Sequence, residues 1–170
     1  MNTSRIELFK GDITAVDSDA VVNAANGTLL GGGGVDGAIH RVAGPGLLEE
    51  CRTLNGCQTG DAKITAGYNL KARHVIHTVG PVWHGGYQNE TELLASCYRT
   101  SLGLAKEHNL KTVAFPAIST GVYRFPKSEA ASIAVNETMK FLEQSMIPEK
   151  VIFVLFDDES YEIYRKLIDR

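Results

Sequence analysis

The stretch Val151-Ile-Phe-Val-Leu-Phe156 is a nearly continuous apolar run, and a segment of helical period with Tyr161, Tyr164 and Ile168 follows it from about Asp158. An apolar run of this length without alternation is typical of a central strand that is covered on both faces. The stretch therefore predicts a buried strand that leads into a terminal helix.

Further apolar runs of the same kind occur upstream, at Ala20-Val-Val22, Val75-Ile76 and Thr112-Val-Ala-Phe115. Ile6 and Leu8, by contrast, alternate with polar neighbours, as residues of an edge strand do. Strands that alternate with helical segments are typical of an α/β fold. We expect five or six strands layered with helices.

Two helices are predicted between these runs. The segment from Asn89 to His108 has apolar residues at helical spacing, and Asn89 followed by Glu92 resembles a capping box. The segment 128–144 carries a second apolar face, and Pro148 is expected to stop that helix before the final strand. No repeat or linker interrupts the pattern, so we expect one domain over residues 1–170.

The composition excludes several classes of protein. Seventeen Lys and Arg against 20 Asp and Glu argue against a surface that binds nucleic acid or acidic lipid. No apolar run approaches the roughly 18 residues of a membrane span, and we expect no membrane association. The three cysteines contain no CxxC pair, which argues against a disulfide framework or zinc site and favours the reducing cytoplasm.

Glycine clusters at Gly31 to Gly34, immediately before a predicted helix. A backbone without Cβ atoms approaches a ligand closely, and the positive end of a helix attracts anions. A second candidate loop, Ser119-Thr120-Gly121, also follows a buried strand. These loops suggest a bound diphosphate, and four glycines immediately before a helix favour it over the two alternatives, a flexible hairpin or a close contact between helix and sheet.

Two other nucleotide motifs do not fit. Gly32, Gly34 and Gly37 satisfy GxGxxG, but Cys57 stands where the dinucleotide fingerprint needs an acid. A Walker P-loop is excluded because the chain has no Gly-Lys pair.

Polar residues cluster just after the predicted strands, where ligands of open α/β sheets bind. Asp36 and His40 lie four apart on one helix face, where they either activate a water or complement the helix end and fill a half-buried position. Asn23 and Asn26 suit ribose hydroxyls but also suit turns.

Asp12 and Phe156 each allow two interpretations. Asp12 either accepts a hydrogen bond from an adenine amino group or makes a local Asx-turn, and Phe156 either stacks on the adenine or belongs to the core.

Metal and nucleophilic chemistry are disfavoured. His74 and His77 are three apart on a strand and point to opposite faces. Ser119 lacks a GxSxG elbow, and no cysteine begins a helix after a strand. We therefore expect no metal and no covalent intermediate.

Several blocks of the chain resemble a macrodomain of the MacroD type, close to its bacterial O-acetyl-ADP-ribose deacetylase branch. The blocks run nearly end to end in the family's order: Gly11-Asp-Ile-Thr14, Val22-Asn-Ala-Ala-Asn26, residues 31–40, Thr59-Gly-Asp-Ala-Lys-Ile-Thr65, Val75-Ile-His-Thr-Val-Gly-Pro81 and residues 115–123. The resemblance implies a three-layer α/β/α fold with a central mixed sheet of about six strands and a cleft for ADP-ribose.

The resemblance also implies residue roles. Asn26 and Asp36 match the family's catalytic positions, and His40 matches a supporting one. The ligand-binding positions that it implies are Asp12, Ile13, Asn23, Ala25, Gly31, Gly32, Gly33, Gly34, Val35, Ser119, Thr120, Gly121, Val122, Tyr123 and Phe156. Asp12 with Ile13 would bind adenine, the two loops would hold the diphosphate, and Tyr123 would pack on the distal ribose.

The expected activity is hydrolysis by water of an ester on the distal ribose, without metal or cofactor. O-acetyl-ADP-ribose and mono-ADP-ribosylated proteins are the expected substrates and partners. Because the chain retains Asn26, Asp36 and the Gly-Gly-Gly-Val-Asp stretch, an enzyme is favoured over a non-catalytic ADP-ribose reader. The charge balance disfavours the remaining alternative, a regulatory RNA-binding protein.

Overall fold

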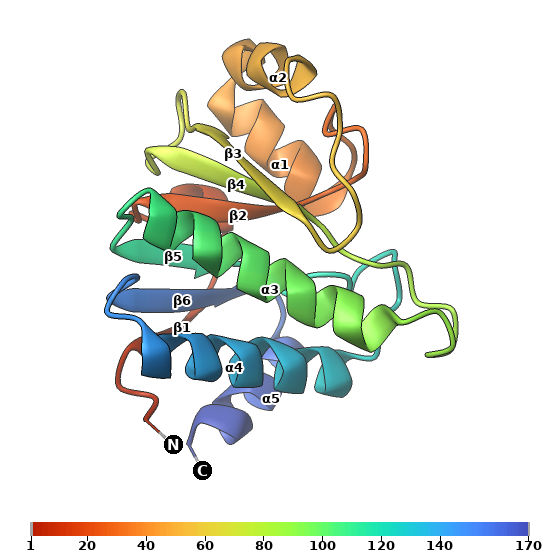
Figure 1. The fold of residues 1–170 in the computed structure, drawn as a ribbon, viewed down its shortest axis with the longest axis vertical. Helices are drawn as coiled ribbons and strands as arrows, with labels where there is room; N and C mark the ends of the chain where they lie inside the picture. The colour runs from red at the N-terminus through yellow and green to blue at the C-terminus, as the bar shows by residue number, and fades with distance from the viewer. Residues whose placement is uncertain (1, 170) are drawn as a thin grey trace.

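A computed structural model describes residues 2–169, and over this range a six-stranded sheet runs in the order β1-β6-β5-β2-β4-β3 (Figure 1). The strands are β1 (Ile6–Lys10), β2 (Ala20–Ala25), β3 (Ala62–Ala66), β4 (His74–Val79), β5 (Thr112–Phe115) and β6 (Lys150–Leu155). The helices are α1 (Gly34–Ala43), α2 (Pro45–Arg52), α3 (Glu90–Glu107), α4 (Lys127–Gln144) and α5 (Asp158–Ile168), with a short 3-10 helix, η1 (Ile13–Ala15).

The sheet is mixed, as predicted. Only the pairing of β3 with β4 is antiparallel, and the other four pairings are parallel. The four apolar runs of the sequence form the interior strands β2, β4, β5 and β6, and the alternating run forms β1 at an edge. β3, whose sequence shows no clear alternation, forms the other edge and was not predicted.

Hydrophobic clusters lie on both faces of the sheet, which gives the three layers that the resemblance implies. Side chains of α3, α4 and α5 pack with one face around Phe115 and Phe153. Side chains of α1 and α2 pack with the other face around Val21 and Val75. Each central strand is therefore covered on both sides, which is why its sequence is almost wholly apolar.

The parallel pairings bring the carboxyl ends of five strands to one edge. β1 pairs with β6 along its length, from Ile6 opposite Val151 to Lys10 opposite Leu155. β6 pairs in parallel with β5, β5 with β2, and β2 with β4. The segments that follow these strands therefore lie in a row, although they are far apart in the sequence.

The predicted capping box at the start of α3 is wrong. Asn89 adopts a left-handed conformation with φ 63°, and its side chain makes no capping hydrogen bond. Glu90 instead turns its carboxylate toward the preceding loop, where it accepts hydrogen bonds from the backbone N–H groups of His84, Gly86 and Gln88. The cap motif failed because the first residue of the helix, Glu90, binds the preceding loop, and Asn89 does not adopt the extended conformation of a capping residue.

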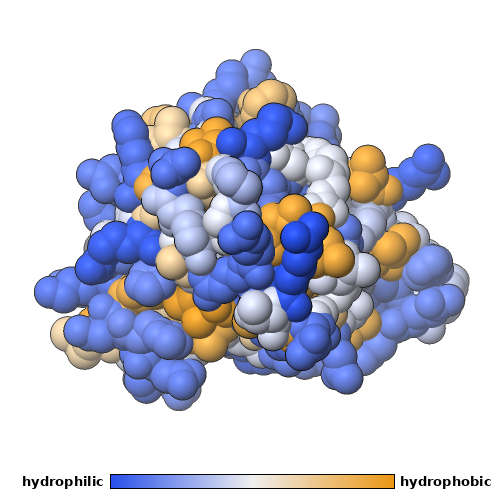
Figure 2. All heavy atoms as spheres, turned by 90° about the horizontal axis from the view of Figure 1, so that it is seen from above, coloured by the Kyte–Doolittle hydropathy of each residue, from blue (hydrophilic) through white to orange (hydrophobic). Residues whose placement is uncertain are grey.

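Figure 2 shows the surface from the α2 end of the molecule, where hydrophilic side chains cover most of the area and hydrophobic ones form separate patches. Within residues 2–169, no helix is both long enough and apolar enough to cross a membrane.

Candidate functional site

Five segments that follow parallel strands form the row at the carboxyl edge of the sheet. From the β1 edge inward they begin at Gly11, Phe156, Pro116, Asn26 and Gly80. Asp12 and Phe156 thus lie at one end of the row, beyond neighbouring strands, and the Asn26 segment lies near the other. The structure brings the predicted adenine and ribose residues to opposite ends of one edge.

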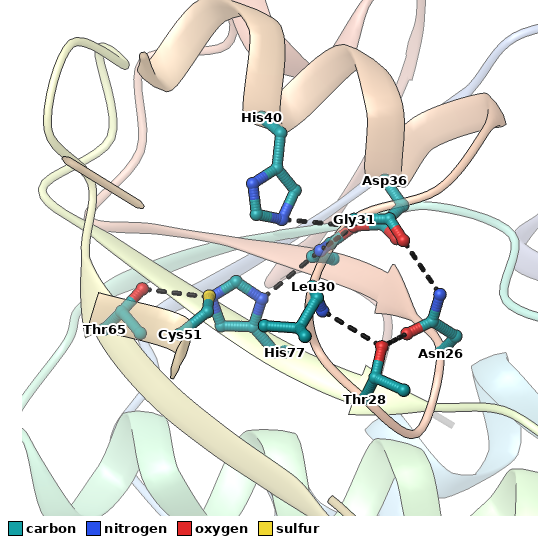
Figure 3. Close-up of polar contacts among 10 residues, drawn as sticks. Asn26, Thr28, Leu30, Gly31, Asp36, His40, Cys51, Thr65 and His77 are labelled. Carbon is teal, nitrogen blue, oxygen red and sulfur yellow. Dashed lines mark hydrogen bonds and ion pairs between the residues drawn. The ribbon is translucent and has the colours of Figure 1, made fainter. Parts of the chain in front are cut away.

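Asp36 lies in the first turn of α1, and Asn23 of β2 holds it from below. Asn23 donates a hydrogen bond from Nδ2 to Oδ1 of Asp36 at 2.9 Å, and Nε2 of His40 lies 3.4 Å from the same oxygen (Figure 3). Asp36 is 5% exposed and Asn23 is fully buried. The predicted Asp36–His40 pair is therefore in contact, and Oδ1 of Asp36 is occupied within the protein.

Asn23 and Ala25 lie inside β2, because this strand extends three residues past the predicted run. The side chain of Ala25 lies in the hydrophobic cluster beneath α1, as does that of Ile13. Ala25 ends β2 and Ile13 follows β1, so both positions lie at the carboxyl edge of the sheet, where the resemblance implies the ligand. Val35, in the first turn of α1, is half-buried against the same cluster.

Asn26 follows the last residue of β2 and turns its amide toward the glycine segment. Its Nδ2 donates to the carbonyl of Gly31 at 2.9 Å, and its Oδ1 accepts from the hydroxyl of Thr28 at 2.7 Å. Since an amide carries two N–H donors and an oxygen with two lone pairs, one donor and one acceptor remain for a ligand. Asn26 is thus held in place and still available.

The four positions of the glycine run differ in why a side chain would be unfavourable or tolerated there. Gly31 and Gly34 have positive φ values of 95° and 58°, which side chains rarely adopt. A Cβ at Gly32 would lie 3.1 Å from Oδ2 of Asp36, whereas one at Gly33 would meet nothing within 4 Å. The backbone at Gly33 therefore borders open space, where a ligand can approach it.

This open space adjoins the N-terminus of α1. The helix starts at Gly34 with Gly33 as its N-cap, and no side chain caps its first N–H groups. Uncapped N–H groups and the helix dipole together attract anions. The glycine run thus ends at a helix N-terminus whose geometry favours a bound anion.

The second predicted loop, residues 119–123, is held by hydrogen bonds at its base and is exposed at its tip. Phe125 donates its N–H to the carbonyl of Ser119 at 2.9 Å, and Trp83 donates its N–H to the carbonyl of Tyr123 at 2.8 Å. Thr120 donates its hydroxyl to the carbonyl of Ala117. Gly121 and Val122 remain exposed at the tip, and Tyr123 is half-buried.

At the other end of the row lie Asp12 and Phe156, each of which the sequence left with two interpretations. Asp12 makes the local turn and also leaves an oxygen for a ligand, whereas Phe156 does not belong to the core. Oδ1 of Asp12 accepts from both the backbone N–H and the hydroxyl of Thr14, so the Asx-turn forms, and its second oxygen has no hydrogen-bond partner within residues 2–169. Phe156 is 86% exposed, so its assignment to the core is wrong. β6 ends at Leu155, and the ring that follows projects into solvent, where a flat base can stack on it.

His77 of β4 lies behind the site and was not among the predicted residues. Its Nδ1 is 3.2 Å from Nδ2 of Asn23, and its Nε2 is 3.0 Å from the hydroxyl of Thr65 (Figure 3). His77 is fully buried, and this burial, with the nearby charge of His40, lowers the pKa of the imidazole to about 3. Its partners come from β2 and β3, so sequence spacing alone could not reveal the cluster.

Cys51 of α2 lies 3.8 Å from Nε2 of His77, but this pair does not form a nucleophilic dyad. Burial, followed by the charges of Asp36 and Glu50, raises the pKa of the thiol to about 11. A reactive cysteine needs the opposite arrangement, a lowered thiol pKa beside a protonated imidazole. Cys51 is a buried structural residue.

A hollow of about 440 Å³ lies beside the turn that follows Asn26, and none of the predicted site residues lines it. Its walls come from Gly27, Thr28, Leu30, Cys51, Arg52, Asn55 and Gly56. No group of three or more His, Cys, Asp or Glu residues in the described chain is arranged to hold a metal ion.

A mixed α/β sheet whose carboxyl edge carries two glycine-containing loops and an uncapped helix N-terminus defines the class of phosphate-binding α/β domains. A model of one family, described as the Macro domain, matches residues 22–134. The chain belongs to the macrodomain family.

Known relatives cover nearly the whole chain. The O-acetyl-ADP-ribose deacetylase of Salmonella typhimurium is 51% identical and covers 98% of this chain and 95% of its own length. The human ADP-ribose glycohydrolase MACROD2 is 54% identical and covers 96% of this chain and 39% of its own length. A structure of the Oceanobacillus iheyensis macrodomain with ADP superposes with a TM-score of 0.92, at 43% identity, over 99% of this chain and 94% of that one.

Proposed function

We propose that residues 1–170 form one macrodomain that binds ADP-ribose and hydrolyses esters on its distal ribose. The substrates are O-acetyl-ADP-ribose and proteins that carry mono-ADP-ribose on Asp or Glu. The observation that carries the proposal is the convergence of Oδ2 of Asp36 and Nδ2 of Asn26 on Gly32, beside the uncapped N-terminus of α1. The names of the bacterial and human relatives support the same chemistry.

The ligand would lie along the row of strand ends. Adenine would be held by the free oxygen of Asp12 and the exposed ring of Phe156. The diphosphate would lie between the Gly33 segment and the Gly121 loop, where backbone N–H groups and the α1 dipole supply positive potential without lysine. This places the distal ribose beside Asn26 and Asp36.

In the hydrolysis, water adds to the ester carbonyl carbon and the carbon–oxygen bond to the ribose breaks. The ribose oxygen takes up the proton, and a free carboxylic acid leaves. Oδ2 of Asp36 accepts a hydrogen bond from the water or takes its proton, because Oδ1 is occupied by Asn23. The free N–H of Asn26 holds a ribose hydroxyl, so that water and ester stay in reacting geometry.

One assay tests the proposal. The protein is incubated with O-acetyl-ADP-ribose and, separately, with an acceptor protein that carries mono-ADP-ribose on glutamate, and released acetate and ADP-ribose are measured. Catalytic turnover of at least one substrate is expected. Binding of ADP-ribose is measured in parallel by calorimetry. Tight binding without turnover of either ester would show that the protein is a non-catalytic ADP-ribose reader and would refute the hydrolase proposal.

We also propose that the protein works in the reducing cytoplasm. Cys51, Cys57 and Cys97 are all free thiols, and two of them are buried. Cell fractionation followed by immunodetection tests this location, and recovery in the membrane or secreted fraction would contradict it.

A further inference from the structure

We propose that His77 is a positioning residue: its neutral imidazole fixes the amide of Asn23, which in turn holds the carboxylate of Asp36 in the orientation that hydrolysis needs. The inference rests on the proposed hydrolase function for its kinetic part. Its structural part concerns only hydrogen bonds that lie beneath the site.

The distances around Asn23 and His77 determine which atom donates and which accepts in each hydrogen bond. Nδ2 of Asn23 lies 2.9 Å from Oδ1 of Asp36 and 3.2 Å from Nδ1 of His77. An amide nitrogen only donates, and it has two hydrogens, so it donates one to each partner. Nδ1 of His77 must then be an acceptor, and the ring proton must lie on Nε2.

The other side of the ring agrees with this tautomer. Nε2 of His77 lies 3.0 Å from the hydroxyl oxygen of Thr65, and that hydroxyl donates its own hydrogen to the carbonyl of Ala66 at 3.0 Å. The hydroxyl oxygen is therefore free to accept from Nε2–H. The amide of Asn23 therefore donates in two directions: directly to the Asp36 carboxylate, and to His77, whose Nε2–H and the hydroxyl of Thr65 pass the donation on to the Ala66 carbonyl.

Burial makes this arrangement of donors and acceptors hard to reverse. Asn23 and His77 are fully buried and Thr65 is 3% exposed, so solvent does not replace a lost partner. A proton on Nδ1 of His77 would face the N–H of Asn23. If the amide flipped, its oxygen would face both the Asp36 carboxylate and the lone pair of Nδ1.

In this orientation the amide of Asn23 leaves its own oxygen without a hydrogen bond within residues 2–169. Oδ1 of Asn23 is buried and has no hydrogen-bond partner among the described residues. Leaving a buried acceptor unpaired is unfavourable. The arrangement gives up that hydrogen bond and keeps the two donated by Nδ2, one to His77 and one to Asp36.

The hydrogen bond from the fixed amide of Asn23 holds the carboxylate of Asp36 in one orientation. The χ2 torsion of an aspartate is broad, so a carboxylate without fixed partners samples many orientations. Nδ2 of Asn23 and Nε2 of His40, at 2.9 and 3.4 Å, both approach Oδ1. With Oδ1 fixed, Oδ2 faces Gly32 and the open side of the site.

Two substitutions of similar size test the role of the Nδ1 acceptor. His77→Asn places an amide oxygen near the position of Nδ1, whereas His77→Leu has a similar shape and no acceptor. We expect His77→Leu to lower kcat for O-acetyl-ADP-ribose by roughly 10- to 100-fold, because misplaced catalytic groups lose rates of this order. KM and the ADP-ribose Kd should stay within about twofold, since the phosphate and adenine contacts are untouched.

His77→Asn should recover most of the lost kcat. Circular dichroism and thermal melts confirm that both variants fold. If the Leu and Asn variants lose the same kcat, or if the Leu variant loses none, the positioning role is overturned.

A measurement without catalysis keeps the inference testable if His77→Leu does not fold. Nitrogen-15 NMR of the wild type should show His77 neutral with its proton on Nε2 from pH 5 to pH 8. A proton on Nδ1 would overturn the inference. If the wild type hydrolyses neither ester, the proposed function fails separately, and the NMR result still decides the arrangement around His77.

Discussion

Asn26 and Asp36 lie ten positions apart in the sequence, yet both side chains border Gly32. A Cβ at position 32 would lie 3.5 Å from Nδ2 of Asn26 and 3.1 Å from Oδ2 of Asp36. A donor and an acceptor thus face the same small volume, which only a glycine leaves open. A water and a ribose hydroxyl in this volume would be reached by both side chains.

The first prediction concerns this pair. The double variant Asn26→Ala, Asp36→Ala should lower kcat by about 10²- to 10⁴-fold, the usual range for loss of a positioned acid–base group. ADP-ribose binding should weaken far less, because the diphosphate contacts come from backbone groups. Steady-state kinetics and calorimetry measure the two effects, and Asp17→Ala with Asn136→Ala, two exposed positions, is the control. Turnover like that of the wild type would refute the assignment.

The second prediction concerns the Gly121 loop. Gly121→Glu should lower ADP-ribose affinity at least about 100-fold, since a carboxylate would face a phosphate and like-charge contacts cost several kcal/mol. The fold should survive, because a Cβ at Gly121 meets nothing within 4 Å. Gly103→Glu in α3 adds the same charge in a similarly open place and should leave affinity unchanged. Equal affinities for both variants by calorimetry would remove this loop from the phosphate site.

The third prediction tests the exposed ring of Phe156. Phe156→Ala should weaken ADP-ribose binding about 2- to 12-fold, which corresponds to the 0.5–1.5 kcal/mol typical of aromatic contacts. The melting temperature should hardly change, because the side chain is 86% exposed. Met146→Ala, an exposed residue before the amino end of β6, is the matched control. A large loss of stability without loss of affinity would show that the ring serves the fold instead.

The fourth prediction concerns Glu90 at the start of α3. Burial raises the pKa of this carboxyl, but the backbone N–H groups of His84, Gly86 and Gln88 outweigh it and lower the pKa to about 2. Because the folded pKa lies below the unfolded value of 4.5, the stabilisation is complete above pH 4.5 and is lost as the pH falls toward 2.

Glu90→Gln should therefore melt at a lower temperature at pH 7, and the difference from the wild type should shrink between pH 4.5 and 2. Glu107→Gln, an exposed residue in the last turn of the same helix, serves as the control. A constant difference in melting temperature over this range would exclude Glu90 as the titrating group.

The fifth prediction concerns the buried imidazole of His77, which His40 approaches from α1 and Cys51 from α2, with the Asp36 carboxylate on the other side of the Asn23 amide. Its folded pKa of about 3 lies below the unfolded value of 6.5. The unfolded chain thus binds the proton first, and stability falls as the pH drops from 6.5 toward 3. One such group contributes a slope of at most about 1.4 kcal/mol per pH unit.

His77→Asn should flatten this slope, although the variant starts from a lower stability at pH 7. Urea unfolding at pH 7, 6 and 5 measures the slope for both proteins. If the two slopes are equal, the imidazole is already charged in the folded protein at pH 5, and the proposed tautomer is wrong.

The residues that the sequence could place are those whose role depends on neighbours along the chain. Apolar runs such as Thr112–Phe115 identified the interior strands, because a strand covered on both faces must be apolar at every position. The four glycines and Asp36 marked the start of α1, because a helix N-terminus and its loop are continuous in sequence.

Residues whose role depends on distant partners escaped prediction. His77 needs Asn23 from β2 and Thr65 from β3 to form its hydrogen bonds, and nothing in its own segment indicates this. The sequence around Glu90 likewise indicates only an acidic residue in a first helix turn, because its hydrogen-bond partners are backbone N–H groups of the preceding loop. Phe156 was ambiguous because an apolar residue at the end of a core strand reads as core until the strand's end is known.

The pairing of β1 with β6 has a consequence for how the protein reaches its working state. Ile6 pairs with Val151, so the sheet edge that carries Asp12 and Phe156 closes only when segments from near the two ends of the chain meet. Pairings of such large sequence separation form slowly, because loop closure costs entropy before contacts repay it. Affinity for an adenine-containing ligand should therefore appear late in refolding, and it can serve as a probe of completely folded protein in a mixture.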